Sequence, residues 1–360
     1  MTPEETRLTF FDVVQKDDFR ESVIKRLQSN SQGKVVTFPI VFPKLYKYRP
    51  LSKYAVADLK GQRMTATSIG CFNDLFDGAI HLYGTKEERR VAAEQKWRDL
   101  QASLQKIGLS PEIVSHEPFV NTYESMFEEE ERLKFRALEF LGTYVVCLST
   151  KKDSILMWSH YADSQQGICI EYDLNQWDAD SPQRKLLFPV LYTDEPVNTS
   201  ELFDKDAYTI SKYPVDEAVL CAAINKASVW NYENEWRLVY VTLSCDSQNQ
   251  RIPVDVSIQP TAIYLGYHFL KPFFYYDTDD RKAYERAREN LLTFNELMEF
   301  IIGNRIPLYL MRPTIGRYHL NSVPLDANQL MALIAEHVDA PQEMRYYHTV
   351  QDMLIRSLPV

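Results

Sequence analysis

The chain has 360 residues, of which 45% are hydrophobic and 25% charged, so it has the composition of a globular protein with ample interior for a core. Its formal net charge of -10 argues against a long groove for duplex nucleic acid, because phosphate binding rests on Lys and Arg. Five scattered cysteines form no CxxC pair, which excludes the usual zinc-knuckle and redox motifs. The first residues do not resemble a signal peptide, and no apolar run reaches the roughly 20 residues that span a bilayer. We therefore expect a cytoplasmic protein that does not contact a membrane.

The chain begins with residues 1–43, which we predict to be an N-terminal helical lead-in and an extended arm. Pro39 and Pro43 restrict this arm to the edge of a sheet or to extended structure. A predicted strand follows over Leu45–Tyr48, in which side chains alternate, so that Lys47 points away from its two tyrosine neighbours.

Ser52 can cap the next predicted helix, which runs through Leu59 and ends at Gly61. Met64–Ser68 is the second predicted strand. At about residues 86–141 we predict a helical insertion made of two helices. The first covers Lys86–Ile107 and the second Asn121–Leu141, and the first is expected to turn four apolar residues inward: Val91, Trp97, Leu100 and Leu104.

The central stretch joins two apolar strands through a short aromatic helix. Val145–Leu148 and Ile168–Tyr172 are the predicted strands, and Asp153 is expected to cap the helix that begins at Ser154. Spacing of three and four residues places Ile155, Trp158 and Tyr161 on neighbouring surface. Such a helix suits either a ligand-facing wall or a wedge under the sheet in which Trp158 fills the core.

The remaining elements alternate between strands and helices without an internal repeat or a linker. We therefore predict one α+β domain over residues 44–312, with a mixed or antiparallel central sheet, and a C-terminal helical extension over residues 313–360. The predicted strands are Leu187–Tyr192, Leu238–Leu243, Ile263–Gly266 and Ile306–Met311, and the predicted helices are Val215–Ala227, Asp279–Ile302 and Asp326–His337.

The familiar motifs of several enzyme classes are missing. The sequence contains neither GxGxxG nor GxxxxGK[ST], which argues against the common phosphate-binding loops. It also contains neither GxSxG nor HExxH, which argues against serine hydrolases and zincin proteases.

A carboxylate pair precedes the predicted strand at Leu238. Glu233 and Glu235 are two residues apart and share a face that Arg237 continues. Such proximity should raise one carboxyl pKa unless Arg237 offsets the repulsion, and the pair could orient a hydroxyl or act as a base. The alternative is a solvent-exposed ladder of Glu–Arg pairs.

Other polar residues have a structural and a functional interpretation. Asn73, Asp74 and Asp77 follow a strand, where such side chains form turns, although a metal site is conceivable. His160 is a lone helical histidine, typical of either a hydrogen-bonded structural residue or a base. Lys47 and Arg49 could bind an anionic ligand or simply extend their charged tips to solvent.

Six motifs in a fixed order resemble the bacterial domain-of-unknown-function 2971 family over about residues 44–312. They are Leu45-Tyr46-Lys47-Tyr48-Arg49, Phe72-Asn73-Asp74-Leu75-Phe76-Asp77, Cys147-Leu148-Ser149 with Met157-Trp158-Ser159-His160-Tyr161-Ala162, Gly167-Ile168-Cys169-Ile170-Glu171-Tyr172, Glu233-Asn234-Glu235-Trp236-Arg237 and Ile263-Tyr264-Leu265-Gly266. The family implies no settled activity.

The order of these motifs is also similar to that of the ADP-ribosyltransferase fold. This likeness implies that Lys47 stands where a first-strand His or Arg holds the NAD ribose, and that Trp158 or Tyr161 stacks on nicotinamide. It implies that Glu235, with Glu233 beside it, steadies an oxocarbenium-like transition state. The expected catalytic residues are Glu235, Glu233, Tyr161 and His160, and the expected cofactor-binding residues are Lys47, Tyr48, Arg49, Trp158, Ser149 and Asn73.

Three functions follow as hypotheses. The first is a cytoplasmic ADP-ribosyltransferase-like toxin or phage-defence effector that uses NAD to modify a nucleic acid or protein. The second is a non-catalytic sensor that binds a nucleotide or a partner, and the third is a metal-dependent nuclease built on Asn73, Asp74, Asp77 and Glu235. We also predict that Tyr46 or Tyr48, Trp158, Tyr161, Glu233 and Glu235 converge on one cleft.

Overall fold

The computed structural model describes residues 44–74, 76–78, 80–81, 86–140, 142–178, 181–194, 197–198, 214–241, 250–274 and 281–338, together with residue 354. The predicted lead-in and arm, residues 1–43, lie outside the described residues, and so does most of the chain after residue 338.

A mostly antiparallel sheet forms the centre of the described chain, which confirms the predicted α+β class. Its strands follow the order β11-β2-β4-β1-β5-β12-β13-β14, with β10 and β6 beside β4. Among the described strands of this sheet, β12 and β13 pair in parallel. The strands are β1 (Lys44–Arg49), β2 (Arg63–Ser68), β4 (Thr143–Ser149), β5 (Ile168–Asp173), β6 (Leu187–Pro189), β10 (Glu235–Val241), β11 (Arg251–Asp255), β12 (Pro260–Leu265), β13 (Leu308–Pro313) and β14 (Leu320–Leu325).

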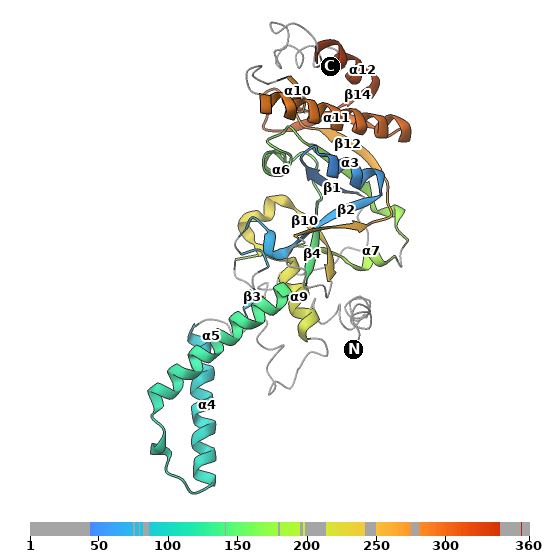
Figure 1. The fold of residues 1–360 in the computed structure, drawn as a ribbon. Helices are drawn as coiled ribbons and strands as arrows, with labels where there is room; N and C mark the ends of the chain where they lie inside the picture. The colour runs from blue at the N-terminus through green and yellow to red at the C-terminus, as the bar shows by residue number, and fades with distance from the viewer. Residues whose placement is uncertain are drawn as a thin grey trace.

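Helices pack at one end of the sheet and project from the other (Figure 1). Helix α11, Arg281–Asn304, turns a stripe of apolar side chains into the main core, at the spacing of three and four residues that an amphipathic helix requires. These side chains are Phe294, Leu297, Met298 and Ile301. Helix α12, Ala327–Val338, lies beside it, and the Asp326 carboxylate accepts hydrogen bonds from the Asn328 and Gln329 amides at its start.

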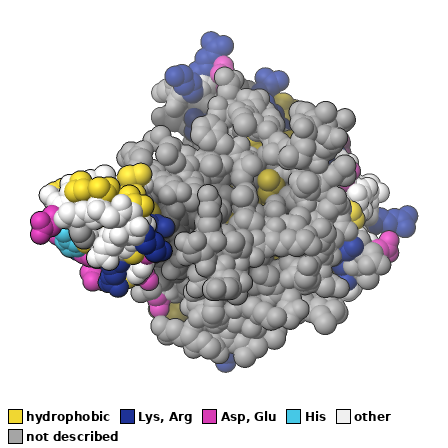
Figure 2. All heavy atoms as spheres, turned by 90° about the horizontal axis from the view of Figure 1, so that it is seen from below, with side chains coloured by type: hydrophobic (Ala, Val, Ile, Leu, Met, Phe, Trp, Pro, Cys, Tyr) yellow, Lys and Arg dark blue, Asp and Glu magenta, His cyan; other side chains and the backbone are white. Residues whose placement is uncertain are grey.

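The predicted helical insertion is a hairpin of α4 (Lys86–Lys106) and α5 (His116–Phe140) that extends away from the sheet. Val91 was expected on the inner side of α4, but 60% of its surface is exposed, so that prediction is wrong. The reason is that α4 packs along one side only, against α5, and Ala93 is the fully buried residue of its described part. Seen from below, hydrophobic side chains gather on one flank of the hairpin among charged ones (Figure 2).

The central unit is β4, helix α6 (Ile155–Tyr161) and β5, as the sequence predicts. The cap differs from the prediction, because the Ser154 hydroxyl, not the Asp153 carboxylate, accepts the hydrogen bond of the Met157 amide. Ile155 was expected beside Trp158, but it faces solvent, whereas Trp158 is fully buried. Helix α6 thus presents a single apolar stripe to the sheet.

Several boundaries differ where strands are short. The predicted strand Leu187–Tyr192 divides at Val190, because β6 pairs with β10 whereas β7 (Leu191–Thr193) pairs in parallel with β9. The predicted helix Val215–Ala227 ends at Ile224, and its last three residues form β9 (Asn225–Ala227). Strand β10 begins three residues earlier than predicted, at Glu235.

Two strands of the sheet have no counterpart in the prediction. β11 pairs with β2, and β14 pairs with β13 inside the expected C-terminal helical extension. The other described elements are α3 (Lys53–Lys60), β3 (Ile80–His81), α7 (Pro182–Lys185), β8 (Val197–Asn198), α9 (Pro214–Ile224), α10 (Lys271–Phe274), and the 3-10 helices η1 (Ile69–Cys71), η2 (Pro111–Ile113), η3 (Leu174–Gln176) and η4 (Ser228–Glu233). Among the described residues, no helix has the length and apolar character needed to cross a membrane.

Gly266 is the position at which the backbone leaves least room. A Cβ atom there would lie 2.1 Å from the Gln165 carbonyl oxygen. We expect Gly266→Ala to lower the free energy of unfolding by at least about 2 kcal/mol, because backbone must move to accept the methyl group. The matched control is Gly303→Ala in α11, where nothing lies within 4 Å. That change should stabilise the helix by up to about 1 kcal/mol. Urea denaturation measures both, and equal effects would contradict the prediction.

Candidate functional site

The main sheet splits along one edge of β4. On the other edge, β10 pairs with β4 over its whole length, from Glu235 opposite Ser149 to Val241 opposite Thr143. On the splitting edge of β4, only Tyr144 and Val145 pair with β2, and only Ser149 pairs with β1. Strands β1 and β2 therefore diverge between these points, and a cleft of about 1080 Å³ opens there. Its walls come from β1, α3, β2 and β11, and its floor from β4, β9 and β10.

Arg237 lies fully buried beneath the floor and uses every N–H donor of its guanidinium. Nε and Nη2 donate to the two carboxylate oxygens of Glu235 at 2.9 and 3.0 Å. Nη1 and Nη2 donate to the two oxygens of Asp77 at 2.8 and 2.7 Å, and Nη1 also donates to the Ala223 carbonyl at 2.7 Å. The Phe72 ring lies 5.0 Å from the guanidinium carbon. Since an arginine has five such donors, its hydrogen-bonding capacity is complete.

Lys226 joins the two glutamates of the predicted pair. Its ammonium donates to Glu233 at 2.6 Å and to Glu235 at 3.2 Å, and lies 3.4 Å from Asp77. The Tyr161 hydroxyl donates to the other oxygen of Glu233 at 2.6 Å. We call these five charged groups, Asp77, Lys226, Glu233, Glu235 and Arg237, the floor network. It contains three carboxylates and two cations, so its formal charge is negative when all are ionised.

Burial and charge separate the two glutamate pKa values, as the sequence predicts for so close a pair. Burial and the Glu235 carboxylate raise the pKa of Glu233. Burial acts in the same direction on Glu235, but the Arg237 and Lys226 cations outweigh it and lower the pKa of Glu235 to about 2. Burial and the bond to Glu233 also raise the pKa of Tyr161, which keeps its hydroxyl a donor.

The predicted alternative, a solvent-exposed Glu–Arg ladder, is wrong. Glu233, Glu235 and Arg237 are all buried. Only Glu235 and Arg237 share a face of β10, whereas Glu233 belongs to the 3-10 helix η4. Asn234 between them has a φ of 46°, a left-handed conformation that brings Glu233 back toward Lys226.

Strand β1 contributes cations to the cleft wall, and the alternation predicted for it holds. The Lys47 ammonium donates to the Cys147 carbonyl at 3.0 Å, on the strand edge where β4 loses its neighbours. Burial lowers the pKa of Lys47. The next cation, Arg49, forms an ion pair with Asp58 at 2.8 Å. The Tyr48 ring points toward α6, where it meets Trp158 edge-on at 5.2 Å, and part of the residue also lines the cleft.

Two of the predicted site residues do not reach the cleft. Trp158 is fully buried, and its indole N–H donates to the Lys152 carbonyl at 2.8 Å, so it fills the core instead of stacking on a ligand. His160 is exposed on α6 and lies against the rings of Tyr161 and Tyr232, outside the cleft lining. The predicted residues that line the cleft are Tyr46, Lys47, Tyr48, Arg49, Asn73, Ser149, Tyr161, Glu233 and Glu235.

Ser149 and Asp74 have structural partners. The Ser149 hydroxyl donates to the Glu233 carbonyl at 2.6 Å and accepts from the Lys151 amide, so it joins β4 to the floor. Asp74 accepts a hydrogen bond from the Phe76 amide, as expected of a turn residue. Asp77 and Glu235, two of the proposed nuclease ligands, are both bound to Arg237. Among the described residues, no group of three or more His, Cys, Asp or Glu is arranged to hold a metal ion.

Sequence reasoning missed Lys226 and underestimated Asp77. Lys226 lay inside a predicted helix, although it is the charged residue that directly follows the apolar run Ala218–Ile224 and Asn225. That position was the available signal, because a lysine buried among apolar residues requires an acidic partner. Arg63 and Arg251 were also missed, and they lie exposed on the β2 and β11 wall of the cleft.

We expect Arg237→Met to lower the free energy of unfolding by about 3–5 kcal/mol, because it leaves Asp77 and Glu235 buried without their shared cation. The matched control is Arg251→Met, which removes an exposed cation from the cleft wall and should change stability by less than about 0.5 kcal/mol. Urea denaturation compares the two. A loss below 1 kcal/mol for Arg237→Met would show that the floor network does not constrain the fold.

The low pKa of Glu235 predicts a specific pH dependence. Its carboxyl changes from a pKa of 4.5 in the unfolded chain to about 2 when folded, so its contribution is complete above pH 4.5 and is lost as the pH falls toward 2. We expect Glu235→Gln to destabilise by about 3 kcal/mol at pH 7 and by progressively less below pH 4.5. The exposed Glu299→Gln is the control. A gap between wild type and Glu235→Gln that stays constant down to pH 3 would contradict the assignment.

A comparison with known families finds one match. The family model described as "Protein of unknown function (DUF2971)" matches residues 157–238. No curated protein and no solved structure matches the chain. The matched residues run from α6 to β10 and include Tyr161, Lys226, Glu233, Glu235 and Arg237. Over this segment, which carries Tyr161 and most of the floor network, the chain is similar to the DUF2971 family.

Proposed function

We propose that the cleft binds NAD and that the chain transfers ADP-ribose from it to a nucleic-acid or protein target, as an ADP-ribosyltransferase-like toxin or defence effector would. The observation that carries this proposal is the distribution of charge in the cleft. The floor network has three carboxylates against two cations, whereas Lys47, Arg63 and Arg251 on the walls have no carboxylate partner among the described residues.

This distribution is complementary to NAD, which carries a cationic nicotinamide ring at one end and an anionic pyrophosphate in the middle. The buried carboxylates favour the cationic end because attraction between charges is strong where water is excluded. The wall cations favour the phosphates. The cleft volume of about 1080 Å³ also suits a dinucleotide, since sites for smaller ligands fall in the range of roughly 300–1,000 Å³.

The chemistry breaks the bond between ribose C1 and the nicotinamide nitrogen, and nicotinamide leaves with the electron pair. Positive charge then develops on the ribose, and a target oxygen or nitrogen attacks C1 and loses a proton. Glu233 is the group placed to stabilise that charge, because its oxygens accept one hydrogen bond each, from Tyr161 and Lys226, and retain free lone pairs. Glu235 accepts three bonds from Arg237 and Lys226, so it positions Lys226.

We expect NAD to raise the melting temperature and NADH to raise it less, because NADH has the same phosphates but a neutral dihydronicotinamide ring. We also expect Glu233→Gln to reduce nicotinamide release by about two powers of ten, the scale of one lost electrostatic contact in a transition state. Its effect on NAD affinity should be smaller, since the contact matters most as charge develops. Thermal-shift titration and chromatographic detection of nicotinamide measure these effects.

The control is Glu299→Gln, an exposed glutamate on α11 that should leave both quantities unchanged. Equal shifts with NAD and NADH would contradict the charge argument. Unchanged nicotinamide release by Glu233→Gln, with wild-type turnover measurable, would remove Glu233 from the mechanism.

The saturation of Arg237 favours a second function, a non-catalytic module that senses a nucleotide. A network whose donors are all used internally can shape a binding surface without taking part in a reaction. This function predicts that NAD or another nucleotide raises the melting temperature while wild-type protein releases no nicotinamide. The release of nicotinamide by wild-type protein, measured on the sample used for the thermal shift, therefore distinguishes the two functions.

A further inference from the structure

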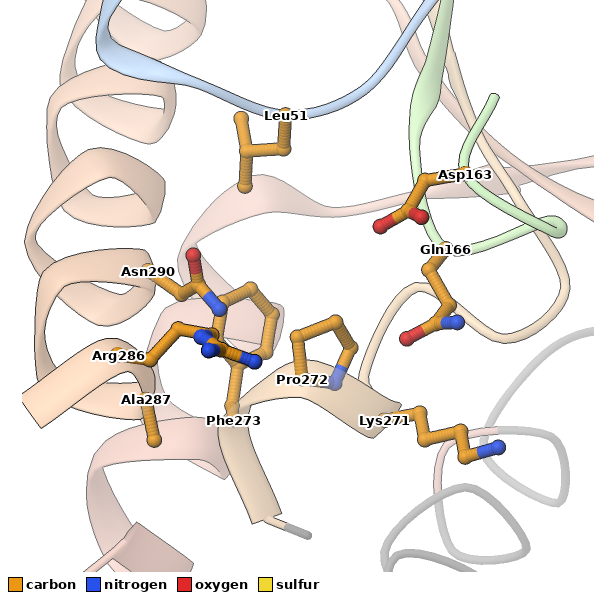
Figure 3. Close-up of a pocket in the computed structure, with 9 residues that line it drawn as sticks. All are labelled: Leu51, Asp163, Gln166, Lys271, Pro272, Phe273, Arg286, Ala287 and Asn290. Carbon is orange, nitrogen blue, oxygen red and sulfur yellow. The ribbon is translucent and has the colours of Figure 1, made fainter. Parts of the chain in front are cut away.

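A second pocket, of about 290 Å³, is lined in part by segments that adjoin the cleft residues (Figure 3). Leu51 lines it just beyond the end of β1, and Asp163 and Gln166 line it from the loop after α6. Helices α10 and α11 supply the opposing wall. The cleft takes Arg49 and Tyr161 from the same two segments, so the pocket and the cleft are neighbours that share no lining residue.

Polar side chains of complementary charge converge on this pocket. Arg286 and Asn290 are one helical turn apart on α11, so their side chains share a face, and both extend toward the space between the walls (Figure 3). The carboxylate of Asp163 and the amide of Gln166 lie across from them. Within the described part of the chain, none of these four side chains makes an ion pair or a hydrogen bond with another residue. Pro272 lies between the two polar groups, Phe273 lies beside Arg286 and Asn290, and Leu51 borders the space from another side (Figure 3).

The Asp163 wall is held in a conformation that costs free energy. Asp163, Ser164 and Gln165 have consecutive positive φ angles of 49°, 53° and 69°. Each such residue costs roughly 1 kcal/mol or more, and such strain persists only where the surroundings enforce it. Here the His268 amide donates to the Gln165 carbonyl at 3.0 Å, and Gly266 lets the backbone approach closely. The carboxylate is therefore presented on a rigid loop.

We propose that this pocket binds a small zwitterion of the neutral α-amino-acid class. Arg286 and the Asn290 amide are placed to donate to a carboxylate, and the Asp163 carboxylate and the Gln166 carbonyl are placed to accept from an ammonium group. Leu51, Pro272 and Phe273 provide the apolar part of the lining for an aliphatic side chain. The volume of about 290 Å³ admits one such molecule and excludes a nucleotide. The proposal does not depend on the function of the cleft.

Three probes of similar shape test the charge pattern by isothermal titration calorimetry. L-leucine carries both charges, 4-methylpentanoate lacks the ammonium group, and 3-methylbutylamine lacks the carboxylate. We expect L-leucine to bind at least roughly tenfold more tightly than either analogue, since each loses one charge-assisted contact. Absence of L-leucine binding at millimolar concentration, or equal affinity for all three probes, would overturn the proposal.

Variants assign the two ends of the ligand. Arg286→Gln should abolish the preference for L-leucine over 3-methylbutylamine, and Asp163→Asn should abolish its preference over 4-methylpentanoate. The matched control is Arg288→Gln, an exposed arginine on the same helix that does not line the pocket, and it should bind L-leucine like the wild type. All three changed positions are exposed, so unchanged melting temperatures are expected and verify the fold. Retention of both preferences in the two pocket variants would overturn the proposal.

Discussion

Arg237 stabilises the arrangement on which the rest of the site depends. Its guanidinium binds Glu235 on the same strand, the end of α9 through Ala223, and Asp77, which is 160 residues away in the sequence. A buried cation of this kind carries a large desolvation penalty, which only a full set of acceptors offsets. Because both oxygens of Asp77 and Glu235 are occupied, neither carboxylate can rotate, and Lys226 and Glu233 are held in turn. The floor of the cleft is therefore preorganised before any ligand arrives.

The cleft itself results from a conflict in strand pairing. Strands β1 and β2 both run antiparallel to β4 and approach the same edge, and each can pair with only part of it. Where they separate, backbone groups of β4 lose their ladder partners, and an unpaired buried carbonyl is costly. The Lys47 ammonium satisfies one of them, at Cys147. This contact explains why a cation in the first strand is compatible with a largely apolar core, and it also places a positive charge on the wall of the cleft.

The cleft and the second pocket are lined in part by the same two segments, the end of β1 and the end of α6. The cleft has negative charge on its floor and positive charge on its walls. In the neighbouring pocket, a rigid loop places Asp163 across from Arg286. Arg49 and Leu51 are two residues apart, as are Tyr161 and Asp163, so the same two segments line both the cleft and the pocket. The projecting α4–α5 hairpin is remote from both and leaves the sheet free to form them.

Features encoded by neighbouring residues could be predicted from the sequence. The alternation of β1, the Ser52 cap, the end of the first helix at Gly61 and the order β4–α6–β5 follow from periodicity and capping, which act over a few residues. The family resemblance could also be predicted, and the sequence pointed to Glu233 and Glu235, which both line the cleft. Tertiary structure alone decided that Trp158 belongs to the core, that His160 faces solvent, and that Lys226 and Asp77 complete the floor network. The physical reason is that burial and ion pairing depend on which strands meet and in what register: Asp77 and Arg237 are 160 residues apart, and no local pattern records their contact.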